Sequence, residues 1–162
     1  MSGKAMSNHG VVIEWQRGDA AFTDHRYSRR HRWRFDGGAE VAGSSSPHVV
    51  RAPYSDPAAV DPEEAFVAAL SSCHMLWFLD LAARAGYVVD RYADEASGSL
   101  TKRADGKSWM SRVVLSPRVT FAGAKAPTDA DVDRLHHEAH DECFLANAYK
   151  GEMEIRGTWS HA

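Results

Sequence analysis

The sequence contains two cysteines, Cys73 and Cys143, and their chemistry depends on whether they meet. Cys73 lies among Ala, Leu, Phe and Trp, where a cysteine usually packs as a small apolar side chain. Two cysteines so far apart in sequence form neither a disulfide scaffold nor a CxxC metal motif. Each nevertheless falls on the inner side of one of two predicted long helices, so the thiols could come within disulfide range. The pair is either two inert core residues or a redox pair.

A reactive Cys73 would need a cation nearby, because an apolar site raises the pKa of a thiol. Glu63, in the first turn of the Cys73 helix, could hold an arginine there, or could simply interact with the helix dipole. On one straight helix, the Cα atoms of Glu63 and Cys73 are about 15 Å apart. A break in the helix, a long arginine or a second subunit would have to connect them. The candidate arginines are Arg26, Arg29, Arg30, Arg32, Arg34 and Arg51.

A histidine-rich segment, HHEAHDEC (136–143), raises the possibility of a metal site. His136 and His140 are four residues apart, as on a zinc-binding helix, and Cys143 lies one turn further on. The spacing differs from HExxH, so a solvated polar face is the favoured interpretation. His74 follows Cys73 directly, but adjacent helical residues point about 100° apart, which makes it a poor base for that thiol. We expect neither a bound metal nor a cofactor.

Several elements would position these residues in the first half of the chain. Short strands are predicted within 11–16 and 31–38, and the Ser- and Pro-rich segment 43–62 is predicted to be a loop. A helix should begin at Asp61 and Pro62 and run to Gly86. Because it is apolar nearly all round, we expect it to be buried by sheet, by a partner subunit or by both.

The second half supplies further strands and a second helix. Asp105-Gly106 predicts a hairpin, and RVVLSPRVTF (112–121) is the most strongly β-prone segment. A helix should begin after Thr128 or Asp129 and stop before Gly151. The apolar stripe of this helix consists of Val132, Leu135, Ala139, Cys143 and Ala146. Residues 152–159 are predicted to form the closing strand. This order predicts an α+β fold.

Length and composition restrict the remaining possibilities. A chain of 162 residues suits one domain, predicted over 10–162 after a disordered 1–9. The net charge of -3 gives no reason to expect nucleic acid or an anionic membrane as partner. No segment reaches the roughly 18 uncharged apolar residues of a membrane span. The N-terminus is polar and lacks a signal core, so we expect a cytoplasmic protein.

The two cysteine segments resemble those of a known family. DPEEAFVAALSSCH (61–74) has a Pro-Glu-Glu start and places Cys73 ten residues after Glu63, as in the OsmC/Ohr family of organic hydroperoxide reductases. DECFLANA (141–148) resembles the family's second cysteine segment, with Phe144 where proline is usual. That difference predicts that Cys143 lies deeper within its helix. The FDGG turn after a strand also suits the family, and the resemblance extends from about residue 10 to the end.

The resemblance implies an intertwined homodimer with central buried helices enclosed by antiparallel sheets. It implies that Cys73 attacks an organic hydroperoxide and becomes a sulfenic acid, and that Cys143 then forms a disulfide with it. By position, Glu63 matches the residue that orients a catalytic arginine, for which Arg30 is the choice and Arg51 the competitor. The resemblance suggests that a dithiol of the lipoyl type would regenerate the thiols.

Two other functions stay open at this point. A protein of the same fold could bind an apolar or electrophilic small molecule without turning it over, and Phe144 keeps that alternative in view. A metal-binding protein based on His136, His140 and Cys143 is the third. A Cys73–Cys143 disulfide induced by peroxide separates the first function from the second, and metal analysis tests the third.

Overall fold

The computed structural model describes residues 7–162, and the contacts within the chain form two compact units that meet in sequence between Pro62 and Glu63. Most of the predicted disordered segment, residues 1–6, lies outside the described residues. Residues 7–10 are exposed and have no helix or strand.

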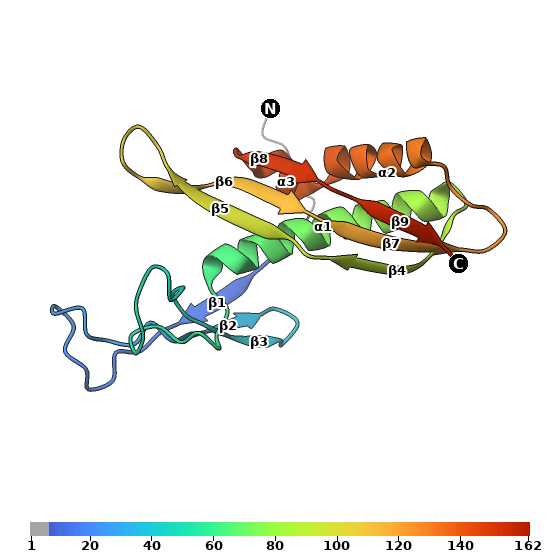
Figure 1. Cartoon of the computed structure of the whole chain (residues 1–162). Coiled ribbons are helices and arrows are strands. Elements are labelled where there is room, and N and C mark those ends of the chain that lie inside the picture. Colours follow the sequence, from blue (N-terminus) through green and yellow to red (C-terminus); the bar gives the residue numbers. More distant parts are fainter. Residues whose placement is uncertain (1–6) are drawn as a thin grey trace, which may run out of the picture. The chain divides into compact units, whose positions relative to one another are not determined.

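The N-terminal unit contains one antiparallel sheet of three strands in the order β1-β2-β3 (Figure 1). The strands are β1 (Val11–Glu14), β2 (His31–Phe35) and β3 (Glu40–Gly43). The first two lie within the predicted segments, and Gly38, with a φ of 88°, occupies the turn that the Asp-Gly-Gly sequence predicted. Residues 44–61 form the expected long loop, apart from a single bridge between Gly43 and Val60.

The C-terminal unit has two sheets, each of three strands, and three helices (Figure 1). One sheet has the order β4-β7-β9 and the other β5-β6-β8, with β8 and β9 added in parallel to antiparallel pairs. The elements are α1 (Pro62–Arg84), β4 (Val88–Asp94), β5 (Ser97–Lys102), β6 (Ser108–Leu115), β7 (Pro117–Ala122), α2 (Asp129–Glu142), α3 (Phe144–Ala148), β8 (Glu152–Ile155) and β9 (Thr158–His161). The α+β class is therefore confirmed.

Helix α1 begins at Pro62, whose fixed φ and missing N–H suit a first helical position. It ends just before Gly86, which has a φ of 79°. Its N-terminal half packs with Val113 and Leu115 of β6, and its C-terminal half with the core around Phe121 of β7 and Leu135 of α2. Cys73 lies between these two clusters along the helix.

A single chain covers only part of α1. In its most apolar 18-residue window only 28% of the residues are buried, and Leu76 is 60% exposed. By length and composition alone α1 could also cross a membrane, although core helices of soluble proteins satisfy the same criterion. The expectation of a fully buried helix is therefore not met within one chain.

The β-prone segment 112–121 forms two strands in different sheets instead of one. β6 ends at Leu115 and β7 begins at Pro117. Between them, the Ser116 N–H donates to the Asp94 carboxylate at 2.6 Å, and Pro117 has no N–H with which to continue the ladder. The closing segment is divided in the same way, since Gly157 separates β8 from β9.

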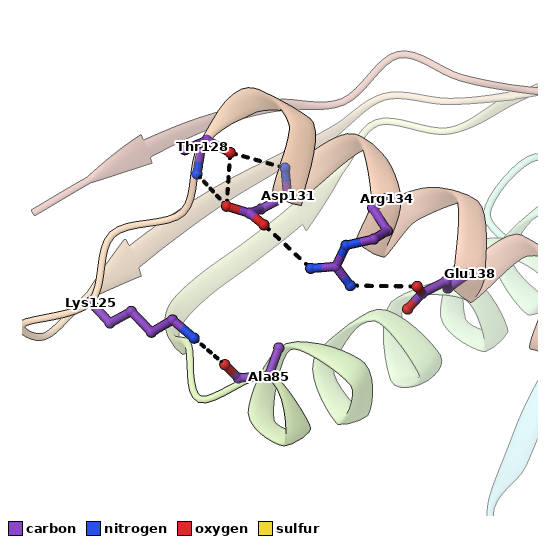
Figure 2. A network of polar contacts seen from close by, with 6 residues as sticks. All are labelled: Ala85, Lys125, Thr128, Asp131, Arg134 and Glu138. Atoms are coloured by element: carbon purple, nitrogen blue, oxygen red, sulfur yellow. Dashed lines mark hydrogen bonds and ion pairs between the residues drawn. The ribbon is translucent and has the colours of Figure 1, made fainter.

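The start of α2 is fixed by a capping box (Figure 2). Thr128 Oγ1 accepts the Asp131 N–H at 3.2 Å, and the Asp131 carboxylate accepts the Thr128 N–H at 2.9 Å. These hydrogen bonds hold the pKa of Asp131 far below its ordinary value. Arg134 pairs with Asp131 and with Glu138 on the same helix (Figure 2). Of the two predicted caps, the structure selects Thr128.

Candidate functional site

The two thiols lie side by side between α1 and the junction of α2 with α3. Cys73 is half-buried, Cys143 is fully buried, and both are free cysteines. Burial raises the pKa of Cys143 to about 11, and the Cys73 thiol, within hydrogen-bonding reach, adds to the shift. Cys143 is therefore a neutral thiol at pH 7 whose partner is another thiol.

Cys143 ends one helix and caps the next. Its backbone is extended, with φ -66° and ψ 110°, and its N–H donates to Ala139 O at 3.1 Å and His140 O at 3.3 Å. Its Sγ accepts the Ala146 N–H at 3.4 Å, as an N-cap side chain does for α3. The prediction that Cys143 lies deep within a helix is wrong, because the helix breaks at this residue.

A pair of histidines lies beside the thiols. His74, the residue after Cys73, and His136 of α2 are both buried, at 0% and 6% exposed. His74 Nε2 and His136 Nδ1 are 3.0 Å apart, and the rings are almost parallel, with 8° between their planes. Phe78 packs on His136 with ring centroids 4.4 Å apart. This contact joins α1 to α2 through a hydrogen bond as well as through apolar packing.

Burial keeps both imidazoles neutral. It lowers the pKa of His74 to about 3, with smaller contributions from His136 and His140. It also lowers the pKa of His136 to about 4, although the Asp133 and Asp94 carboxylates oppose the shift. The expectation that most of the histidines in 136–143 lie on a solvated face is wrong for His136 and holds for the exposed His137.

The free ring nitrogens of the histidines bear on the alternative of a metal site. His74 Nδ1, His136 Nε2 and His140 Nδ1 are buried without a hydrogen-bond partner. Within residues 7–162, however, no three His, Cys, Asp or Glu side chains are arranged so that they could hold a metal ion. One ring nitrogen of His74 and one of His136 are already committed to each other. The segment 136–143 therefore gives no support to a zinc site.

A carboxylate of β4 also contacts α1. Asp94 of β4 accepts hydrogen bonds from the Ser71 hydroxyl and, at 2.6 Å, from the Ser116 N–H. The charge of Asp94 acts on His136 and on Tyr92, whose pKa is raised well above its ordinary value, mainly by burial. Asp94 thereby fixes the chain between β6 and β7, three residues before Val119, which belongs to the core cluster around Phe121 and Leu135.

The other predicted site residues lie apart from the thiols in sequence. Glu63 is half-buried in the first turn of α1. Arg30 belongs to the N-terminal unit, where it pairs with Asp56 and lines a cavity of about 530 Å³ with residues of β1, β2 and β3. Arg51 is exposed in the long loop of the same unit. The structure thus brings Cys73 and Cys143 together. Which arginine acts on Cys73 stays a prediction.

Sequence reasoning did not identify the His74–His136 contact. From the sequence, His74 was considered only as a base for Cys73, and a poor one, because adjacent helical residues point about 100° apart. The signal was available in part, because His136 is seven residues before Cys143 and so shares its side of α2.

Comparisons with known proteins agree with the fold. A family model described as OsmC-like protein matches residues 55–156. An OsmC-like protein of unknown function from Vibrio cholerae is 50% identical, with a TM-score of 0.91, over 94% of this chain and 100% of that one. Two organic hydroperoxide resistance proteins show the same fold. The one from Elizabethkingia anophelis has 17% identity, TM-score 0.68 and coverage of 99% and 100%. OhrB of Bacillus subtilis has 18% identity, TM-score 0.64 and coverage of 96% and 100%. No curated protein sequence matches significantly.

Proposed function

Because this chain belongs to the OsmC-like protein family, we propose that it is a thiol-dependent peroxidase that reduces organic hydroperoxides to alcohols. The observation that carries the proposal is the pair of free thiols, one half-buried and one fully buried, held next to each other between α1 and the α2–α3 junction. Two buried thiols in contact are poised to form a disulfide once one of them is oxidised.

The reaction balances with these two residues and an external dithiol. The Cys73 thiolate attacks the distal peroxide oxygen, the O–O bond breaks, and the alcohol leaves after taking a proton. Cys73 is then a sulfenic acid, and Cys143 attacks its sulfur, forming the disulfide and releasing water. A dithiol, of the lipoyl type in our proposal, exchanges with the disulfide and restores both thiols. Such reductants are abundant in the cytoplasm, where we propose that the protein acts.

Cys73 needs a cation to become a thiolate in this surrounding, because apolar burial disfavours the charged form. We assign this role to Arg30, with Glu63 holding its guanidinium. Arg51 is the competitor. Arg30→Gln should lower kcat/KM for an organic hydroperoxide by at least about tenfold, and Arg51→Gln should change it little. The opposite ranking would transfer the role to Arg51.

We also propose that the protein is a homodimer whose second copy covers α1. Leu76 is 60% exposed on a helix that carries few charges, and an apolar face of that kind is covered in a soluble protein. Leu76→Glu should therefore shift the sedimentation coefficient to that of a monomer. A wild-type protein that sediments as a monomer at micromolar concentration would overturn the dimer.

Peroxide consumption with a dithiol tests the activity itself. The wild type should consume cumene hydroperoxide, and Cys73→Ser should reduce consumption to the uncatalysed rate. Cys143→Ser should still react once, because its Cys73 can be oxidised but cannot form the disulfide. Mass spectrometry should find a Cys73–Cys143 disulfide in the wild type after one equivalent of peroxide. Unchanged peroxide turnover in Cys73→Ser would overturn the proposal. A wild-type protein that consumes no peroxide would favour the alternative of a binding protein.

A further inference from the structure

One face of α1 carries an apolar stripe in which Cys73 is the only reactive residue. Phe66, Leu70, Cys73 and Trp77 are spaced by four, three and four residues, so they lie above one another on the same side of the helix. Leu70 is fully buried, whereas Cys73 and Trp77 are half-buried and Phe66 is 38% exposed. The Cys73 thiol is therefore flanked on both sides along α1 by apolar side chains.

Residues of α3 and its flanks contact this stripe at three places. Phe144 meets Trp77 edge to face, with ring centroids 5.6 Å apart and 90° between the planes. Cys143 meets Cys73. Tyr149 then meets Phe66, with centroids 5.5 Å apart and an angle of 62°. The thiol pair is bracketed along α1 by two aromatic pairs.

The two aromatic pairs differ in distance from Cys73 and in freedom. Trp77 is one helical turn from Cys73, about 6 Å along the axis, and Phe66 is about 10 Å away on the other side. The Tyr149 hydroxyl donates to Met110 O at 3.0 Å, which ties the distant pair to β6. Phe144 has no such anchor and is 67% exposed. The Trp77–Phe144 pair is thus both the nearer pair and the one with the more exposed ring.

We propose that Trp77 and Phe144 form an aryl-binding subsite, which makes the enzyme favour hydroperoxides that carry an aromatic ring on the peroxide-bearing carbon. This inference rests on the proposed peroxidase function. A peroxide whose distal oxygen is about 3 Å from the Cys73 sulfur has its carbon substituents within reach of the next turn of α1. Aromatic rings attract one another edge to face beyond the effect of buried area, so a phenyl substituent gains more there than a methyl group.

Two hydroperoxides make a matched test. Cumene hydroperoxide and tert-butyl hydroperoxide are both tertiary and differ by a phenyl in place of a methyl group. Phe144→Leu should lower the ratio of their kcat/KM values by about two- to tenfold, and Phe144→Tyr should retain it. Phe66→Leu, at the distant pair, is the control and should leave the ratio unchanged. An unchanged ratio in Phe144→Leu, or an equal fall in Phe66→Leu, overturns the subsite.

Binding of the product alcohol separates this inference from the activity. 2-Phenyl-2-propanol should shift the Trp77 indole resonance of the wild type, tert-butanol should not, and Phe144→Leu should weaken the response. If these shifts occur in a protein that consumes no peroxide, the subsite stands and the peroxidase function fails. If peroxide is consumed and neither the shifts nor the ratio depend on Phe144, the function stands and the subsite fails.

Discussion

Two pairs of side chains, one of thiols and one of imidazoles, connect α1 with α2 and the residue that follows it. The ionised form of a thiol is an anion and that of an imidazole is a cation, although the two pairs lie next to each other. Cys73 and His74 are consecutive on α1, and their partners, Cys143 and His136, share one side of α2. Burial raises the pKa of Cys143 to about 11 and lowers those of His74 and His136 to about 3 and 4. The apolar surroundings thus suppress the charged form of each of these three residues, the thiolate of Cys143 and the imidazolium of His74 and His136.

The neutral state of the imidazoles explains why the histidines do not activate the thiols. An imidazole with a pKa near 3 carries no positive charge at pH 7, so it cannot lower the pKa of a neighbouring thiol by charge. His74 instead stabilises the contact between two helices through its hydrogen bond with His136. In the proposed mechanism, Cys73 depends on a cation from another element, so the imidazole pair has a structural role and the thiol pair the proposed chemical one.

Acidification should show the largest effect on the imidazole pair. In the unfolded chain each imidazole titrates near pH 6.5, and in the folded protein near 3 and 4. Their contribution is complete above pH 6.5 and falls as the pH decreases, because the unfolded chain binds protons that the folded one does not. At pH 4 the loss in the free energy of unfolding should be on the order of 3 kcal/mol per imidazole.

Urea unfolding at several pH values measures this loss. The control is a His74→Gln, His136→Gln double variant, whose amides can hydrogen-bond but do not titrate. The carboxylates facing the pair, Asp94 and Asp133, are retained in it, so only the imidazole contribution is removed. A wild-type curve parallel to that of the double variant between pH 6.5 and 4 would show that the pair does not resist protonation.

Removal of one imidazole should destabilise the protein by about 2 to 4 kcal/mol. His74→Ala leaves a cavity next to the ring of His136 and deprives His136 of its hydrogen-bond partner. Chemical denaturation at pH 7.5 measures the change. Ser72→Ala, two residues earlier at an exposed position of α1, should change the stability by less than about 0.5 kcal/mol. Similar losses in the two variants would contradict a buried structural pair.

Alkylation should distinguish the two thiols of the other pair. With a pKa of about 11, Cys143 has about a hundredfold less thiolate than an ordinary cysteine, so iodoacetamide should modify it at least that much more slowly at pH 7.5. Peptide mapping over time gives the rate at each cysteine, and denatured protein provides the reference. Equal native rates at Cys73 and Cys143 would remove the asymmetry on which their proposed roles depend.

The smallest effect on stability is expected at the start of α2, the helix that contains His136 and ends directly before Cys143. Thr128→Ala removes the capping box and should cost about 1 kcal/mol, whereas Thr128→Ser should keep it. Thermal unfolding of the two variants measures the difference. Because the cap is far from Cys143, peroxide turnover should not change in either variant, and a loss of activity in Thr128→Ala would indicate that the position of α2 affects the thiols.

Local residues predicted much of the fold. Pro62 and Gly86 bound α1, Asp105-Gly106 forms the hairpin between β5 and β6, and Thr128 caps α2. Each of these depends on φ, on a missing N–H or on a side chain that reaches its own backbone, all of which are encoded within a few residues. The apolar stripe of α2 was predicted for the same reason, because helical periodicity alone fixes it.

The errors arose where a distant partner decides the structure. The segment 112–121 divides at Ser116 because Asp94, more than twenty residues earlier, accepts its N–H. His136 is buried because His74, from another helix, provides a hydrogen bond that offsets the cost of burying it. The break at Cys143 likewise went unpredicted, since Phe144 gave no sign of a helix boundary.

The sequence by itself determined the elements, the family and the two cysteines worth attention, because motif spacing and residue type are local properties. Only the tertiary structure decided that the thiols of Cys73 and Cys143 touch, that His74 pairs with His136, and that Phe144 lies against Trp77. These contacts arise when α2 and α3 pack along α1, and the low polarity of that packed interior, absent in the unfolded chain, sets the pKa values of the cysteine and the histidines.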